Sequence, residues 1–277
     1  MISSGCSKVK VVTCIYDLGR ASVDGRTIED YSDWIRRTFQ IFNDITVYYD
    51  SETLRSKLDS GQNWRKKSVS RFSLSSEYDE ILSICRLLSK KSNDMTFQLP
   101  QYAMLQFEKF QFLANEQRYH PEIKGFLWVD AGLSRFIGSK YTSATPSNLG
   151  NFDKLCSRDR SLFEVDVKNN LSLFGDLKYV ETGSCQRTFS GTAFYISKND
   201  VRKYASLTHE VALEWISKFR WDNEQIALNQ LFLRKLISPR ILIQKGETGS
   251  VGRFALGLES ARIIPSWPIR KINHYAS

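Results

Sequence analysis

The sequence predicts an α/β fold, a single Rossmann-like domain in which helices flank a mostly parallel mixed sheet. Residues 8–17 (KVKVVTCIYD) are apolar and β-branched along most of their length, a pattern typical of a strand covered on both faces. Residues 27–42 carry apolar side chains at three- and four-residue spacing, which indicates an amphipathic helix, and residues 45–50 (ITVYYD) form a second strand. Strand, helix and strand in this order make a βαβ unit, whose right-handed crossover leaves the two strands parallel.

Capping signals and hydrophobic periodicity define the other elements. Thr27 is the expected N-cap of the first helix, with Asp30 at the capping-box position. Residues 60–76 and the stretch from Ser134 to about Gly183 read as loops, because they are polar and without a clean period. The periodicity further predicts helices over 77–91, 101–119, a stretch of about twenty residues ending near Phe219, and 222–236, and strands over 125–130, 192–197 and 239–244. No internal repeat appears, so one continuous domain over 1–277 is expected.

Composition narrows the partners. The 39 Lys and Arg against 30 Asp and Glu give a formal charge of +9, which favours anionic partners, although solubility alone also explains such an excess. The five cysteines include no CxxC pair, which predicts a reducing compartment. The sequence has no signal-peptide core and no apolar run long enough to span a membrane, so we predict a cytoplasmic protein. No nucleic-acid-binding motif occurs, and no nucleic acid partner is expected.

A basic segment stands out within the predicted loop over 60–76. Arg65, Lys66, Lys67 and Arg71 lie close to Trp64, a composition that fits phosphate binding or peripheral contact with the inner face of a membrane. A solvated surface explains the same residues. The sequence leaves these alternatives open.

Three acids follow predicted strands directly: Asp17, Asp50 and Asp130. A strand-terminal Asp is most often a turn or cap residue, but ligands of open parallel sheets bind beyond the carboxyl ends of the strands. Asp130 is the most informative of the three, because it ends the buried-looking FLWV run and precedes Ala131 and Gly132, which leave room for a ligand. Metal ligation by Asp130 is the resulting hypothesis.

A second group of polar residues opens the helix predicted over 222–236. Asp222 and Glu224 are either cap residues favoured by the helix dipole or carboxylates presented to an acceptor hydroxyl as a general base. His274, near the end of the sequence, is a weaker candidate metal ligand. The sequence contains no G-x-S-x-G, Walker or G-x-G-x-x-G motif, which disfavours α/β-hydrolases, P-loop enzymes and dinucleotide-binding enzymes.

Four stretches together, VTCIYDLGR, FLWVDAGLS, FSGTAFYIS and WDNEQIALNQLFL, resemble the HtrL/YibB-like family of bacterial glycosyltransferase-like proteins, which is associated with lipopolysaccharide core and surface-glycan loci. The resemblance covers about residues 10 to 245 and implies a GT-A-type nucleotide-diphospho-sugar transferase fold. It also implies a nucleotide-binding half over about 8–133 and an acceptor-side half over about 134–277.

The resemblance implies roles for particular residues. The donor nucleotide would lie against Thr13, Tyr16, Asp17, Arg20 and Asp50. Asp130 matches the place of the Asp-x-Asp motif that holds Mn²⁺ or Mg²⁺ in such enzymes, but Gly132 stands where the second acid belongs. Gly191 and Thr192 would face the acceptor, and Asp222 or Glu224 would be the catalytic acid group.

The implied activity is transfer of a sugar from a nucleotide-diphospho-sugar to a glycan or lipid-linked acceptor, in a hexosyltransferase-type reaction whose stereochemistry stays open. The alternative is a catalytically degenerate GT-A-fold protein that binds a glycan or a partner. Lipopolysaccharide biosynthesis is the expected process.

Overall fold

The computed structural model describes residues 9–42, 44–58, 61–137, 155–156, 159–165, 189–243, 249–256 and 263–264. Within these residues one eight-stranded sheet has the order β3-β2-β1-β4-β6-β5-β7-β8. Six strands run in one direction, and β6 and β8 run against them. The predicted α/β fold with a mostly parallel mixed sheet is therefore confirmed. The strands are β1 (Val9–Ile15), β2 (Ile45–Tyr49), β3 (Asn63–Lys66), β4 (Gly125–Val129), β5 (Leu162–Val165), β6 (Phe189–Ser197), β7 (Arg240–Ile243) and β8 (Ile263–Ile264).

The first βαβ unit forms as expected. Strands β1 and β2 pair in parallel, and helix α2 (Ile28–Ile41) connects them. The side chain of Thr27 accepts a hydrogen bond from the Asp30 N–H (3.2 Å), and the Asp30 carboxylate accepts one from the Thr27 N–H (2.8 Å), so the predicted capping box is present.

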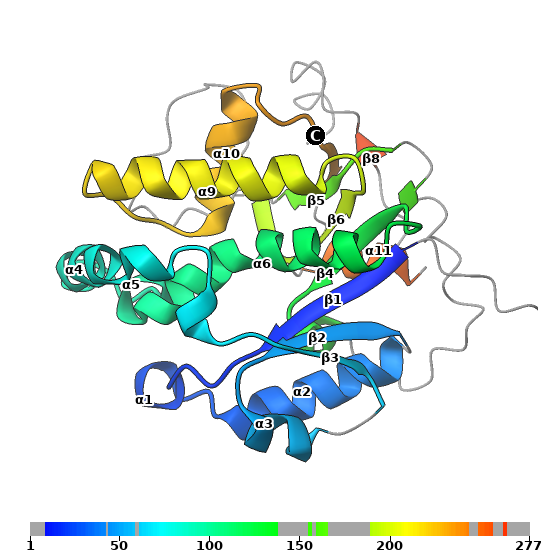
Figure 1. Ribbon diagram of the computed structural model, residues 1–277, viewed down its shortest axis with the longest axis horizontal. Helices are drawn as coiled ribbons and strands as arrows, with labels where there is room; N and C mark the ends of the chain where they lie inside the picture. Colours follow the sequence, from blue (N-terminus) through cyan, green and yellow to red (C-terminus); the bar gives the residue numbers. More distant parts are fainter. Residues whose placement is uncertain are drawn as a thin grey trace, which may run out of the picture.

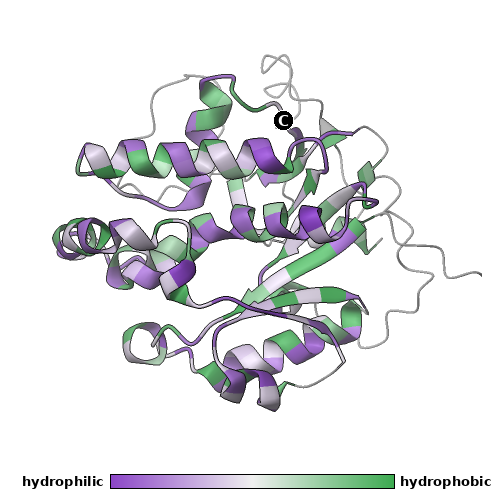
Figure 2. Ribbon diagram, viewed as in Figure 1, coloured by the Kyte–Doolittle hydropathy of each residue, from purple (hydrophilic) through white to green (hydrophobic). Residues whose placement is uncertain are grey.

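Helices cover both faces of the sheet (Figure 1). One core contains α4, α5, α6, α9 and α10 together with Val12, Cys14 and Trp128, and the other contains α2, α3 and α11 together with Val11 and Val129. Successive residues of each central strand thus enter opposite cores, which explains why β1 and β4 are buried along their whole length; β1 is largely green in Figure 2. The helices are α1 (Ala21–Asp24), α3 (Glu52–Lys57), α4 (Tyr78–Leu88), α5 (Met95–Gln98), α6 (Pro100–Tyr119), α9 (Val201–Ser217), α10 (Glu224–Leu233) and α11 (Ser250–Ala255).

Two loop predictions were wrong. Residues 60–76 contain the edge strand β3, and the middle stretch contains β5, which pairs with β6 and β7. β3 (NWRK) is mostly polar, and a glutamate interrupts the apolar residues of β5 (LFEV), so neither strand shows an apolar run in the sequence. The last predicted helix begins at Glu224 rather than Asp222, because Asn223 caps it by accepting the N–H groups of Gln225 (3.1 Å) and Ile226 (3.2 Å).

The basic segment on β3 is anchored by acids. Arg65 Nε donates to the buried Glu116 (3.3 Å), and Lys67 Nζ donates to the buried Glu108. Lys66 forms an exposed ion pair with Glu52 (3.2 Å). These contacts hold the segment against α6 and α3. None of the described helices is both long enough and apolar enough to cross a membrane.

Candidate functional site

A pocket of about 390 Å³ opens at the carboxyl ends of β1 and β4, the edge at which ligands of open parallel sheets bind. The start of β6 reaches the same edge because this strand runs antiparallel to β4. The middle of α6, the first turn of α10, the segment after β1, the start of α2 and the 3₁₀ turn Leu133–Phe136 complete the walls. The polar residues that line it are Cys14, Tyr16, Arg20, Arg26, Tyr31, Tyr102, Gln106, Lys109, Asp130, Arg135, Thr192, Glu224 and Gln225.

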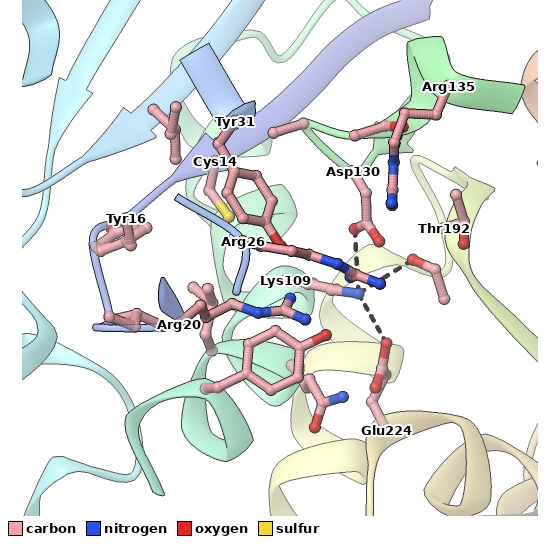
Figure 3. A pocket seen from close by; sticks show the side chains of 18 of the residues that line it. Cys14, Tyr16, Arg20, Arg26, Tyr31, Lys109, Asp130, Arg135, Thr192 and Glu224 are labelled. Atoms are coloured by element: carbon pink, nitrogen blue, oxygen red, sulfur yellow. Dashed lines mark hydrogen bonds and ion pairs between the residues drawn. The ribbon is translucent and has the colours of Figure 1, made fainter. Parts of the chain in front are cut away.

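Lys109 lies at the centre of this pocket (Figure 3). Its Nζ donates to Glu224 Oε1 (2.8 Å) and to the Gly191 carbonyl oxygen (3.1 Å), and it forms an ion pair with Asp130 Oδ1 (3.2 Å). The ammonium therefore joins α6, α10 and the ends of β4 and β6. Two hydrogen bonds and one ion pair hold this ammonium, which fixes the position of its charge.

The two carboxylates keep Lys109 charged in spite of its burial. Burial lowers the pKa of Lys109, but Asp130 and Glu224 raise it further, so the net shift is upward. Burial raises the pKa of Glu224, and the contact with Lys109 offsets part of that shift. One oxygen of the Glu224 carboxylate, Oε2, has no hydrogen-bond partner within the described part of the chain. A buried carboxylate oxygen without a donor is available to accept a hydrogen bond from a ligand.

Asp130 is the more open of the two acids, with 38% of its side chain exposed. Its Oδ1 accepts a hydrogen bond from Trp128 Nε1 (2.8 Å) as well as the contact from Lys109, and its backbone N–H donates to the Thr192 carbonyl oxygen (2.8 Å). Strand pairing and an indole together set the direction of this carboxylate.

Arg135 fills the space that Gly132 leaves. A Cβ at position 132 would lie 3.0 Å from both Nε and Nη2 of Arg135, so a larger residue there would displace the guanidinium. Arg135 also lies over the Trp34 ring, 4.3 Å from its centroid, and its Nε donates to the Gly132 carbonyl oxygen (3.2 Å). Burial and the charge of Arg26 lower the pKa of Arg135, as expected where cations gather.

Gly191 gives similar room to Glu224. An added Cβ would lie 2.1 Å from Glu224 Oε1 and 3.3 Å from Lys109 Nζ. The carboxylate, rather than open space for a sugar, occupies the place beside this glycine.

Two more cations line the side of the pocket formed after β1. Arg20 lies 4.8 Å from the centroid of the Tyr102 ring and 5.6 Å from that of Tyr31. Burial lowers the pKa of Arg20, but the hydrogen bond to Asp24 and the nearby Tyr102, Tyr31 and Asp24 together raise it, so the net shift is upward. Arg26 contacts the same carboxylate, with Nε 3.5 Å from Oδ2 of Asp24. Burial raises the pKa of Tyr102 to about 12, so its hydroxyl stays protonated.

The structure brings six of the predicted site residues to one pocket: Tyr16, Arg20, Asp130, Gly191, Thr192 and Glu224. Thr13, Asp17, Asp50 and Asp222 are not among the residues that line it. His274 lies outside the described residues.

The four predicted site residues outside the pocket lie in a strand or in the turns that follow or precede secondary-structure elements. Thr13 is fully buried within β1, and Asp17 Oδ1 accepts the Gly19 N–H (3.2 Å) in the following turn. Asp50 has its pKa raised by burial and by the nearby charge of Asp17. Asp222 is fully buried, and its Oδ1 accepts the Asn223 N–H (2.7 Å). Asp222 therefore contributes to the start of α10 rather than to the pocket wall.

Sequence reasoning missed Lys109, Arg26 and Arg135. Lys109 had a visible signal, because Glu108 and Lys109 are the only charged residues between 101 and 115, in a helix with many apolar side chains. Arg135 had none, since the loop that follows Gly132 determines where its side chain points.

The donor set around Asp130 does not fit a divalent metal. Asp130 Oδ1 and Glu224 Oε1 are both engaged by Lys109, and Arg135 occupies the place of a second acid. Mn²⁺ and Mg²⁺ require several oxygen ligands, whereas a fixed ammonium and a guanidinium beside the same carboxylate repel a cation. The described ranges also contain no group of three or more His, Cys, Asp and Glu side chains placed to hold a metal.

No protein-family model matches the chain, and no curated protein sequence matches it. Among solved structures, core-mannan synthase A from Aspergillus fumigatus in its Mn/GDP form covers 83% of this chain and 70% of its own, with 9% identity and a TM-score of 0.49. A 4-diphosphocytidyl-2C-methyl-D-erythritol synthase from Anaerococcus prevotii covers 90% and 96%, with 12% identity and a TM-score of 0.37. Both scores are low, so the account of this protein rests on its own sheet and side chains.

Proposed function

We propose that the protein is a GT-A-type glycosyltransferase that transfers a sugar from a nucleotide-diphospho-sugar to an acceptor hydroxyl. The observation that carries the proposal is one pocket at the carboxyl edge of the sheet that is lined by the cations of Lys109, Arg135, Arg20 and Arg26 and by a buried carboxylate, Glu224, with an oxygen left to accept a proton. Cations suit a diphosphate leaving group, and the carboxylate suits an acceptor.

The donor would lie with its nucleoside on the β1 side of the pocket, near Tyr16 and Arg20, and its diphosphate toward Arg135 and Lys109. Negative charge grows on the diphosphate as the bond to the anomeric carbon breaks. Cations already in position stabilise that charge without reorganisation, which is a large source of catalysis in water-poor sites. Asp17 would act through the turn after β1, Asp50 from the end of β2, and Thr13 through the packing of β1.

Glu224 is the favoured acid of the two candidates, because it lines the pocket and Asp222 does not. In an inverting reaction, the acceptor oxygen bonds to the anomeric carbon as the bond from that carbon to the diphosphate oxygen breaks. The acceptor proton passes to the Glu224 carboxylate, and the diphosphate leaves with the electron pair. In a retaining reaction Glu224 would orient the acceptor instead. Gly191 and Thr192 form the adjoining acceptor-side wall.

The resemblance to HtrL/YibB-like proteins supports a surface-glycan or lipopolysaccharide-type acceptor, and cytoplasmic synthesis of such a glycan would bring the enzyme to the inner face of a membrane. The exposed Arg71 and Lys66 beside β3 are the residues for that contact. The three acid pairs on β3 limit the charge available there.

One observation favours the alternative of a catalytically degenerate glycan- or partner-binding protein. Lys109 engages both acids of the pocket, and a base held in an ion pair is a weaker proton acceptor. In that case the donor site would bind nucleotide sugar without turnover.

A panel of UDP- and GDP-sugars tests the proposal by thermal stabilisation and by assay of donor hydrolysis and transfer. At least one donor should raise the melting temperature and be hydrolysed. The Glu224→Gln variant should keep the stabilisation and lose turnover by about 100- to 10,000-fold, the range for a general base. Glu80→Gln, on the exposed face of α4, is the matched control and should leave both unchanged. Stabilisation by none of the donors would rule out the transferase, and stabilisation without turnover would favour the degenerate protein.

A further inference from the structure

Two cations flank Asp130, the acid that matches the metal motif of the resembled family. Lys109 Nζ lies 3.2 Å from Asp130 Oδ1 on one side. Arg135 lies on the other side of the same turn, in the space that the missing side chain of Gly132 leaves, and the charge of Asp130 acts on its guanidinium. Figure 3 shows Lys109 and Arg135 approaching this carboxylate from different elements.

Gly132 takes the place of the second acid of the motif, and it also leaves room for the guanidinium of Arg135. Its φ is −83°, a conformation open to any residue, so backbone geometry does not demand glycine there. The nearest atoms to an added Cβ belong to the Arg135 guanidinium, 3.0 Å away, so a side chain at position 132 would shift this arginine. An arginine beside Asp130 supplies a permanent positive charge where a second carboxylate would supply a metal ligand.

Lys109 is held in place by contacts from three elements. Glu224, Gly191 and Asp130 supply one oxygen contact each from three different elements, and 8% of the side chain is exposed. These two hydrogen bonds and one ion pair hold the buried ammonium beside the pocket, where it acts on a ligand as a positive point charge. Asp130 therefore acts as a positioning residue for Lys109.

We infer that this pocket binds the diphosphate of its donor through Arg135 and Lys109 without a divalent metal. The inference rests on the proposed function for the identity of the donor, and it makes that function metal-independent. Guanidinium pairs with phosphate oxygens in a bidentate geometry, and an ammonium pairs with them as a point charge. Both would take over the charge neutralisation that Mn²⁺ or Mg²⁺ supplies elsewhere.

Calorimetric titration with inorganic pyrophosphate, UDP and GDP tests the inference, with each ligand measured in excess EDTA and again in saturating Mn²⁺. The two affinities should agree within about twofold for the unmodified protein. Arg135→Met should weaken binding by about tenfold to a hundredfold under both conditions, the range for loss of a charged hydrogen bond. Arg86→Met, an equal change of charge on the exposed face of α4, should bind as the unmodified protein does.

Each other outcome has a definite meaning. Binding that disappears in EDTA and returns with Mn²⁺ overturns the inference but leaves the proposed transferase intact. Binding of pyrophosphate in EDTA without binding of either nucleotide supports the cationic diphosphate site and counts against the nucleotide-sugar donor. Binding of none of the three ligands overturns both.

A converse experiment restores the acid. The double variant Gly132→Asp with Arg135→Ala removes the guanidinium and places a second carboxylate two residues after Asp130. Its nucleotide binding should weaken by about tenfold or more in EDTA and recover in Mn²⁺, because the new carboxylate and Asp130 can then share a metal. Unchanged affinity of the double variant in EDTA would mean that Arg135 does not contact phosphate, and the inference would fall. Circular dichroism of both variants establishes that they fold.

Discussion

Two basic regions of the molecule differ in what lies opposite their charges. On β3, Arg65 and Lys67 each contact a buried glutamate of α6, and Lys66 contacts Glu52. In the pocket, no carboxylate of the described chain forms an ion pair with Arg135. Lys109 forms ion pairs with Asp130 and Glu224, and all three side chains line the cavity.

The difference shows that the cations behind the +9 charge of the chain have different roles in different parts of the fold. The cations of β3 fasten an edge strand to a helix, and a ligand would have to compete with acids already in contact. The pocket is a cavity, and Arg135 on its wall forms no ion pair with a carboxylate of the described chain, so an anion can reach this guanidinium without competing with an acid already in contact. A basic residue therefore indicates an anion-binding site only when the fold does not already pair it with acidic side chains.

The largest effect is expected from Lys109→Met. Removal of the ammonium leaves Glu224 buried against Gly191 without its cation, and an uncompensated buried charge costs about 3–5 kcal/mol of unfolding free energy. Denaturant unfolding measures the loss. The double variant Lys109→Met with Glu224→Leu removes both charges and should recover most of it. Equal losses in the single and double variants would contradict a coupled pair.

Glu164 on β5 is a buried acid whose carboxylate accepts a hydrogen bond from a backbone N–H group instead of pairing with a cation as Glu224 does. Glu164 Oε2 accepts the Gly249 N–H (3.0 Å), and its Oε1 has no partner among the described residues. Burial raises the pKa of Glu164 from the usual 4.5 to about 7, while the N–H groups at the start of α11 lower it. The folded protein therefore keeps a proton that the unfolded chain releases.

The sign of the pH dependence follows from that proton. Between pH of about 4.5 and about 7 the folded state binds more protons than the unfolded state, so the unfolding free energy should fall as pH rises, by roughly 3 kcal/mol across the window. Unfolding titrations at several pH values measure the slope. Glu164→Gln should flatten it, and equal slopes for both proteins would rule out Glu164 as the source.

A smaller effect is expected from Arg65→Met on β3. Glu116 would lose one charged donor but keep the hydroxyls of Tyr48 (2.9 Å) and Thr46 (3.2 Å), so the cost should be about 1–3 kcal/mol of unfolding free energy. The affinity for pyrophosphate should not change. A loss of affinity similar to that of Arg135→Met would erase the distinction between the two basic regions.

The smallest effect is expected from Lys66→Met. Its partner Glu52 is exposed, and the pair lies on the surface, where water and salt screen it. Neither the unfolding midpoint nor the pyrophosphate affinity should move measurably. A weaker affinity of this variant for anionic vesicles would support β3 as a membrane contact, whereas unchanged vesicle binding would count against it.

The sequence predicts the central fold well because strong periodicity and capping chemistry specify it. The run over 8–17, the capping box at Thr27 and the apolar 125–129 each encode an element that tertiary context did not alter. The short strands β3 and β5 are different. Their pairing with neighbouring strands defines them, and pairing between distant segments has no local signature.

The candidate site is predictable only in part. Asp130 and Glu224 could be proposed because ligands of open α/β sheets bind beyond the carboxyl ends of the strands, where acids at a strand end and at a helix start can meet. The meeting of Lys109 with both of them joins residues up to 115 positions apart, which no spacing rule encodes. Gly132 illustrates the same limit, because its meaning depends on the arginine that fills its space.

The structure of the protein bound to the nucleoside diphosphate that stabilises it most is the most direct test of the cationic pocket. The account predicts that diphosphate oxygens lie within hydrogen-bond distance of Arg135 and Lys109, beside Asp130, with no metal ion between them. A diphosphate bound through a metal on Asp130, or bound at β3 or elsewhere outside the pocket, would contradict it.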